Sequence, residues 1–177
     1  GRSEGSPDEQ GTYRDAEAAW RYLTGQRQIP PCRIILYGES LGGAVAAWLA
    51  VREKPAALVI ASGFTSVPDL GQQLYPYLPV RWLARIRYDT REHLRSVAAP
   101  VLIAHSREDE IIPFEHGQAL FTVANPPKQF LEPLGVGSFL GNLPLHLLGM
   151  LACHTITHRF FVGLLKLVRT DCLSLRR

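Results

Sequence analysis

The stretch that decides the fold runs Arg33-Ile34-Ile35-Leu36-Tyr37-Gly38-Glu39-Ser40-Leu41-Gly42-Gly43. Its first part, residues 33–37, is a short apolar run typical of a buried parallel strand, and Gly38 ends it. Alanines and leucines then predict a helix over residues 41–53, and residues 57–61 form a second buried strand. A strand, a helix and another strand in this order predict a right-handed parallel unit.

The same alternation continues toward the C-terminus. Residues 100–105 restore the strand pattern, residues 114–124 predict a helix, and residues 129–132 predict a last strand. The sequence therefore predicts an α/β fold with a mostly parallel sheet flanked by helices.

Two further segments frame these elements. Thr12 and Asp15 have the spacing of a capping box, and apolar residues then recur at helical spacing until Gly25. Residues 63–96 contain several prolines among Leu, Tyr and Trp, which predicts short helical pieces joined by turns.

Composition restricts the class of protein. The chain has 177 residues, 46% hydrophobic and 20% charged, with a net charge of +3, which is typical of one globular domain. A charge this small gives no support to nucleic-acid binding. The three cysteines are too widely spaced for a zinc site, so no metal is expected. No basic and apolar leader follows Gly1, which favours a cytoplasmic or peripheral membrane protein.

The Gly-x-Ser-x-Gly pattern at Gly38 to Gly42 is the first indication of a catalytic site, because it lies between the expected strand and the expected helix. A serine on such a tight turn projects its hydroxyl over the strand ends, so Ser40 is the candidate nucleophile. The flanking glycines are expected because a Cβ would collide where strand and helix meet. The backbone N–H of Leu41 would face a developing oxyanion. The competing interpretation is a serine that merely caps the helix.

An activated serine needs a base and an acid, in the chain order serine, acid, histidine. The loop after the strand at 100–105 carries three acids, of which Asp109 is the preferred triad acid. Its neighbours Glu108 and Glu110 are the alternatives, as is the hypothesis that all three are surface charges. His105 precedes the acid and is expected to be a structural histidine at a strand end.

These motifs together resemble α/β-hydrolases of the Bem46-like group. The resemblance covers most of residues 1–135 and is carried by Gly1-Arg2-Ser3-Glu4-Gly5-Ser6-Pro7, Tyr13-Arg14-Asp15-Ala16-Glu17-Ala18-Ala19-Trp20, Leu36-Tyr37-Gly38-Glu39-Ser40-Leu41-Gly42-Gly43, Phe64-Thr65-Ser66 and Asp109-Glu110-Ile111-Ile112-Pro113-Phe114. It implies a serine hydrolase with Ser40 as nucleophile and Asp109 as triad acid. It also implies no cofactor and a small-molecule or lipid-like acyl substrate, and some members of the group associate with membranes.

The chain departs from the family pattern after the last strand. The resemblance implies a Gly-x-Gly-His turn that supplies the general base, but Gly135-Val136-Gly137 is followed by Ser138. The later histidines His146, His154 and His158 do not stand in the motif. One hypothesis is a reading-frame slip in the source DNA near codon 138, which resequencing would test.

The resemblance also implies a domain organisation for the chain. It implies a partial α/β-hydrolase domain over residues 1–138, lacking its N-terminal strands and the second oxyanion donor, with a lid-like segment over 63–96. Residues 139–177 form an atypical apolar and basic tail. The predicted function is hydrolysis of an ester or thioester through an acyl-enzyme, in a truncated or degenerate member. The alternatives are a non-catalytic hydrolase-like protein that binds a ligand or membrane, and a peptidase of the same fold.

Overall fold

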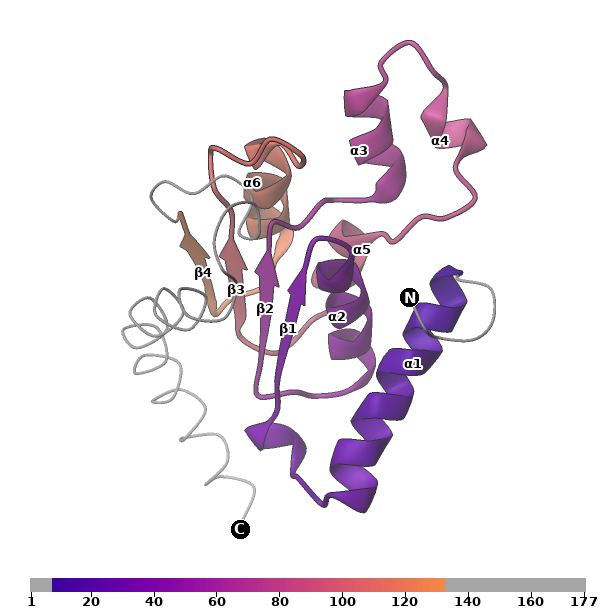
Figure 1. The fold of residues 1–177 in the computed structure, drawn as a ribbon. Coiled ribbons are helices and arrows are strands. Elements are labelled where there is room, and N and C mark those ends of the chain that lie inside the picture. Colours follow the sequence, from indigo (N-terminus) through magenta and orange to yellow (C-terminus); the bar gives the residue numbers. More distant parts are fainter. Residues whose placement is uncertain (1–7, 133–177) are drawn as a thin grey trace, which may run out of the picture.

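The computed structural model describes residues 8–132, so Ser138, His146, His154, His158 and the expected tail lie outside the described residues. Four parallel strands form the sheet in the order β1-β2-β3-β4 (Figure 1). Their bounds are Ile35–Glu39, Ala57–Ala61, Val101–Ala104 and Lys128–Leu131. The parallel sheet predicted from the sequence is confirmed.

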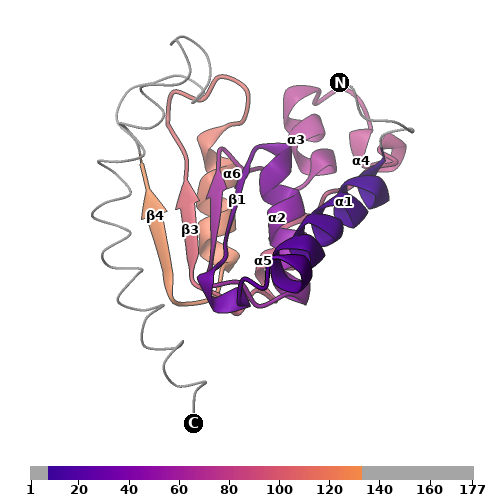
Figure 2. The ribbon, with the colours of Figure 1, turned by 60° about the horizontal axis from the view of Figure 1, so that its bottom comes forward.

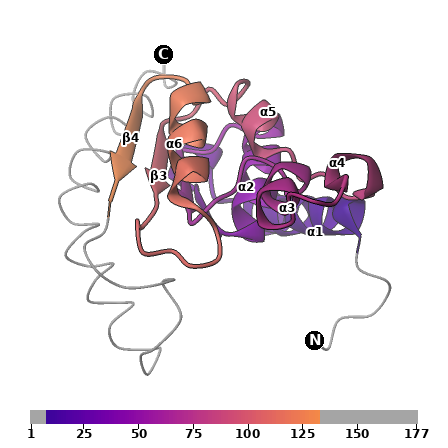
Figure 3. The same ribbon diagram turned by 90° about the horizontal axis from the view of Figure 1, so that it is seen from above.

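Helices cover one face of this sheet. α2 (Leu41–Arg52) packs on β1 and β2, α6 (Phe114–Val123) packs on β3 and β4, and α5 (Thr90–Leu94) contacts both helices (Figures 2 and 3). Each successive strand is added on the same side of the previous one. Right-handed crossovers therefore bring the connecting helices to the same face.

The remaining helices lie outside this layer. α1 (Glu9–Arg21) packs against α2 and continues into a π-helical turn, Tyr22–Gln26. α3 (Val67–Leu74) and α4 (Val80–Leu83) stand beyond the carboxyl ends of the strands (Figure 1). The expectation of short helical pieces between residues 63 and 96 is confirmed.

Two apolar clusters hold the layers together. One joins the sheet to α2, α5 and α6 and is centred on Leu58, Ile60, Leu94, Ile103 and Leu120. The second joins α1 to α2, where the rings of Tyr13 and Trp48 stack with centroids 4.3 Å apart. The second cluster places α1 beside the helix that follows Ser40.

Three expected boundaries are wrong by a few residues, including the end of the first strand, which continues through Gly38 to Glu39 because both residues pair with β2. α1 begins at Glu9, not at Thr12, because the side chain of Asp8 caps it by accepting from the N–H of Gly11. The hydroxyl of Thr12 instead donates to the carbonyl of Glu9 at 2.8 Å. The first strand begins at Ile35, since Pro31–Arg33 form a 3-10 turn and pairing with β2 starts at Ala57.

Among residues 8–132, no helix has the length and apolarity needed to cross a membrane. The same part of the chain contains no cluster of three or more His, Cys, Asp or Glu side chains arranged to hold a metal ion.

Candidate active site

Ser40 occupies the turn between β1 and α2. Its backbone has φ 51° and ψ −119°, a conformation that residues with a Cβ rarely adopt. The turn is held by bonds from the N–H of Ser40 to the carbonyl of Ala61 at 2.9 Å and from the N–H of Gly43 to the carbonyl of Ser40 at 3.0 Å. The side chain of Ser40 makes no capping bond to α2, and the residue is exposed. Ser40 is thus the N-cap residue of α2 by position, but its hydroxyl does not serve as the cap.

The glycines around Ser40 differ in how tightly they are enclosed. A Cβ on Gly38 would overlap the carbonyl group of Gly42 and lie 2.6 Å from the nitrogen of Gly43. A Cβ on Gly43 would lie 2.9 Å from Cγ2 of Ile60, whereas one on Gly42 would meet nothing within 4 Å. The expectation that both flanking glycines are required by crowding holds for Gly38 and fails for Gly42.

Leu41 is the first residue of α2, so its N–H belongs to the amide groups that have no carbonyl partner within the helix. These amides lie at the positive end of the helix dipole. The end of α2 next to Ser40 is therefore suited to stabilise a negative oxygen.

Asp109 lies in the loop between β3 and α6. Its Oδ1 accepts from the backbone N–H groups of Ile111 at 3.0 Å and Ile112 at 2.9 Å, and its side chain is 2% exposed. Glu108 and Glu110 are exposed. Of the three acids in this loop, only Asp109 is both buried and fixed by hydrogen bonds.

Ser40 and Asp109 follow strands that are separated by one strand. The register places Glu39 opposite Ala61 and Ala61 opposite Ala104, so the carboxyl ends of β1, β2 and β3 are level. With neighbouring strands roughly 4.8 Å apart, the ends of β1 and β3 lie about 10 Å apart. A group the size of an imidazole would have to bridge the serine and the acid.

None of the three histidines in residues 8–132 is placed to be that bridge. His105 is fully buried, and its Nε2 lies 2.9 Å from the carbonyl oxygen of Ile112 and 3.6 Å from Oδ2 of Asp109. His116 is held by Thr65, and His93 is half-buried beside Tyr13. Burial lowers the pKa of both His93 and His116. The structural role expected for His105 agrees with its contacts.

The model of the prolyl oligopeptidase family matches residues 7–129 of the chain. The chain belongs to this family of α/β-hydrolases. The superfamily expected from the sequence is thereby confirmed.

Curated relatives of this α/β-hydrolase come from bacteria and animals. An uncharacterized protein of Mycobacterium tuberculosis is 44% identical over 137 residues, which cover 77% of this chain and 49% of the relative. Alpha/beta hydrolase domain-containing protein 17B of Homo sapiens is 36% identical over 141 residues, which cover 77% of this chain and 45% of the relative. The chain thus spans about half the length of the curated relatives it matches.

Solved structures share the fold. An alpha-beta hydrolase from Vibrio vulnificus superposes with a TM-score of 0.65 at 20% identity, over 89% of this chain and 59% of that protein. Four parallel strands flanked by helices therefore constitute a partial α/β-hydrolase fold, as expected.

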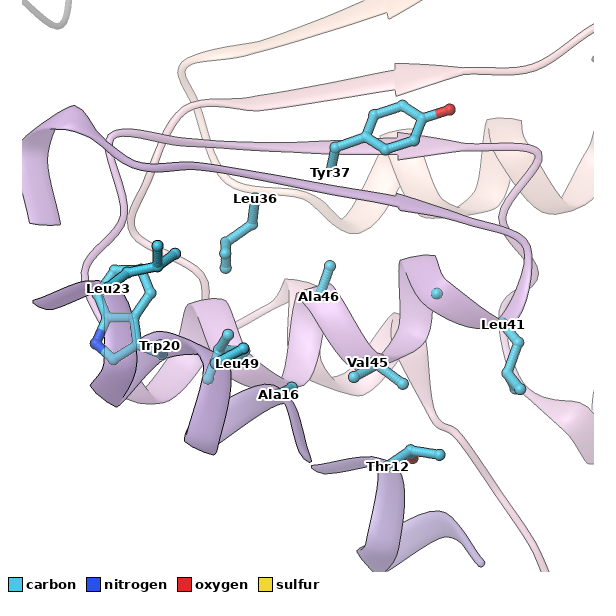
Figure 4. A pocket seen from close by; sticks show the side chains of 12 residues that line it. Thr12, Ala16, Trp20, Leu23, Leu36, Tyr37, Leu41, Val45, Ala46 and Leu49 are labelled. Carbon is cyan, nitrogen blue, oxygen red and sulfur yellow. The ribbon is translucent and has the colours of Figure 1, made fainter. Parts of the chain in front are cut away.

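An apolar groove of about 420 Å³ borders the turn of this α/β-hydrolase chain (Figure 4). It lies between α1, α2 and the outer edge of β1, and its lining includes Trp20, Leu23, Leu36, Leu41, Val45 and Leu49. Gly42 also lines it, which explains why a Cβ there would meet open space. The groove follows the edge of β1, where the resemblance implies further strands in the family.

The sequence did not predict the polar network formed by His116, Thr65 and Asp69. Nδ1 of His116 accepts from the N–H of Thr65 at 3.2 Å, and the hydroxyl of Thr65 lies 3.1 Å from Oδ2 of Asp69. Asp69 in turn pairs with Arg91 at 3.1 Å. Because Nδ1 accepts, the proton of the neutral ring of His116 is assigned to Nε2. Thr65 and His116 are 51 residues apart, so no local pattern in one sequence points to their contact.

Proposed function

We propose that this chain is part of a Bem46-like serine hydrolase that cleaves an ester or thioester through an acyl-enzyme on Ser40. The observation that carries the proposal is the backbone of Ser40, at φ 51° and ψ −119°, directly between β1 and the N-terminus of α2. This is the strand–turn–helix context in which a Gly-x-Ser-x-Gly serine acts as a nucleophile.

In the proposed reaction, Oγ of Ser40 attacks the acyl carbonyl carbon while its proton passes to a base. The carbonyl π electrons move onto oxygen, and the resulting oxyanion receives a hydrogen bond from the N–H of Leu41. Collapse expels an alkoxide or thiolate, which takes up the proton and leaves the acyl group on Ser40. Water then releases the carboxylic acid and restores the serine.

Asp109 is proposed to orient the base. Its Oδ1 is occupied by the amides of Ile111 and Ile112, so the base is proposed to bind Oδ2, which lies 3.6 Å from Nε2 of the buried His105. We assign the base to the position after Gly137, where the family resemblance implies histidine and this chain has Ser138. Loss of the base costs a large factor in rate.

An apolar acyl group is the proposed substrate class. The segment beyond the strand ends carries the exposed apolar side chains of Tyr75 and Leu78. Apolar side chains on a segment beyond the carboxyl ends of the strands suit a small-molecule or lipid-like acyl substrate.

The second candidate function is non-catalytic binding. Non-catalytic binding is favoured because Ser138 stands where the base is expected. It is also favoured because the three described histidines are engaged in other contacts. Covalent labelling by a fluorophosphonate distinguishes the two candidates, since only an activated serine reacts at an appreciable rate.

The experiment compares the chain with Ser40→Ala and Ser138→His. We expect slow labelling that disappears in Ser40→Ala and becomes at least about 10-fold faster in Ser138→His, because a general base contributes about 100-fold or more. Folded Ser138→His protein that still fails to label would contradict the proposal. A panel of p-nitrophenyl esters, acyl thioesters and aminoacyl amides then separates esterase from peptidase activity, with esters and thioesters expected to react.

A further inference from the structure

The segment between β2 and α5 forms a projection whose ends are joined. The N–H of Val67 donates to the carbonyl of Arg87 at 2.8 Å, so the chain leaves and re-enters the body of the molecule at one place. α3 and α4 lie between these points, beyond the carboxyl ends of the strands (Figure 1). Residues 75–86 include the outer part of this projection and are called here the 75–86 surface.

The projection has a defined internal structure. A Cβ on Gly71 of α3 would lie 2.6 Å from Cγ1 of Val80 in α4, so the two helices are in close contact. Backbone bonds from Tyr75 to Gly71 at 2.9 Å and from Leu78 to Tyr75 at 3.0 Å fix the connection. The side chains outside this contact are therefore presented by a folded unit.

Large apolar side chains concentrate on this projection. Seven of the eleven exposed large apolar residues among the described residues fall between Leu74 and Ile86. Tyr77 is 97% exposed, Trp82 is 92% exposed and Leu83 is 67% exposed. Isolated exposed apolar residues are ordinary on a protein surface, but a cluster of this kind indicates an interaction site.

The charge of the segment indicates the partner. Residues 75–86 contain two arginines and no Asp or Glu, Arg85 is exposed, and the nearest acids in the sequence are Asp69 and Asp89. Tyr and Trp are the side chains enriched at the membrane–water interface, and arginines beside them are attracted to anionic headgroups. Tyr77 and Trp82 are exposed on nearly all sides, so a partner that covers them has to surround each side chain. A fluid lipid interface can do this.

From these observations we propose that the 75–86 surface docks onto an anionic lipid bilayer, with Tyr77, Trp82 and Leu83 entering the interfacial region and Arg85 facing the headgroups. Docking is independent of the proposed hydrolysis, so it is expected unchanged in Ser40→Ala. It would hold the carboxyl ends of the strands, where Ser40 lies, toward the membrane.

The test uses the whole 177-residue chain and vesicles of phosphatidylcholine with or without about 30% phosphatidylserine. We expect co-sedimentation with the anionic vesicles, weaker binding without phosphatidylserine and weaker binding at high salt. Trp82 is also a reporter, because Trp20 is 4% and Trp48 is 8% exposed. Anionic vesicles should shift tryptophan emission to shorter wavelength and shield it from acrylamide, and Trp82→Phe should abolish both changes.

Matched substitutions locate the contact. Arg85→Glu reverses one charge and is expected to weaken binding about 30-fold, since one positive charge near the membrane contributes about 5-fold. Arg27→Glu, also at an exposed arginine, serves as its control. The double variant Tyr77→Ser, Trp82→Ser should lose binding, while Tyr22→Ser, at a residue 48% exposed, should retain it.

Two different results would overturn the proposal. Vesicle binding that survives the Tyr77→Ser, Trp82→Ser change would place the membrane contact elsewhere in the chain. A chain that ignores vesicles but forms a dimer dissociated by the same double variant would make this surface a self-association site. Circular dichroism checks that the variants are folded, as expected for exposed side chains.

Discussion

Gly38 and Gly42 flank Ser40 symmetrically in the sequence, but they have different surroundings. Gly38 is enclosed by the backbone of the turn, which cannot move without disrupting α2, while Gly42 faces the apolar groove. We predict that Gly38→Ala lowers the free energy of unfolding by about 1–3 kcal/mol through overpacking. Gly42→Ala should leave it unchanged or raise it by up to about 1 kcal/mol, because alanine favours a helix. Urea unfolding of both variants measures the difference.

Asp109 is predicted to stabilise the loop in addition to any catalytic role. Asp109→Ala leaves the amides of Ile111 and Ile112 without their acceptor and should cost about 1–3 kcal/mol of unfolding free energy. Glu110→Ala, at an exposed neighbour, should change it by less than about 0.5 kcal/mol. Equal effects of the two substitutions on thermal or urea unfolding would contradict the assignment of Asp109 as the fixed acid.

The network of His116, Thr65 and Asp69 predicts a pH dependence of stability. Burial lowers the pKa of His116 in the folded state, with Asp69 and Glu115 opposing and His105 and Arg91 reinforcing the shift. The unfolded state therefore binds more protons below about pH 6.5, and stability falls as the pH drops through this value. One histidine contributes a slope of at most about 1.4 kcal/mol per pH unit.

Between pH 7.5 and 5.5, His116→Asn should reduce that slope while retaining an acceptor for the N–H of Thr65. His93 has a pKa lowered in the same direction, so some slope should remain until His93→Gln is added. The free energy of unfolding measured at several pH values checks this. A slope unchanged in the double variant would show that other groups are responsible.

At the scale of elements, one carboxylate joins α1 to the segment before α5. Glu9 accepts from the N–H groups of Arg87 at 2.7 Å and Tyr88 at 2.9 Å, and from the hydroxyl of Tyr13 at 2.9 Å. We predict that Glu9→Ala lowers the free energy of unfolding by about 2 kcal/mol, because two backbone amides lose a charged acceptor. Glu17→Ala removes only exposed ion pairs with Arg21 and Arg52 and should cost less than about 1 kcal/mol.

At the scale of the whole molecule, β1 is an edge of the sheet formed by residues 8–132. An open edge next to an apolar groove favours pairing with another strand. We predict concentration-dependent self-association of the chain, measured by light scattering. Tyr37→Lys, at a residue of β1 that is 58% exposed, should reduce it, whereas Tyr22→Lys should not.

Much of the fold is predictable because its signals are local. The strand at 57–61 was predicted with the bounds that the structure has, and the helices after Ser40 and Pro113 begin where expected and end one residue early. The start of α1 was wrong because Asp8, three residues before Gly11, caps the helix, while the hydroxyl of Thr12 bonds to the carbonyl of Glu9 and lies 3.0 Å from the hydroxyl of the distant Tyr88. Element order and type depend on hydrophobic period, whereas boundaries depend on tertiary contacts.

The sequence by itself determined the order of strands and helices, the turn at Ser40 and the loop that carries the acid. These depend on short-range sterics and hydrophobic pattern, which residues near each other in the chain decide. Only the tertiary structure separated buried Asp109 from exposed Glu108 and Glu110, joined Thr65 to His116, and placed Tyr77 and Trp82 in solvent. Burial and long-range hydrogen bonds depend on which distant segments the fold brings together, and no local pattern contains that information.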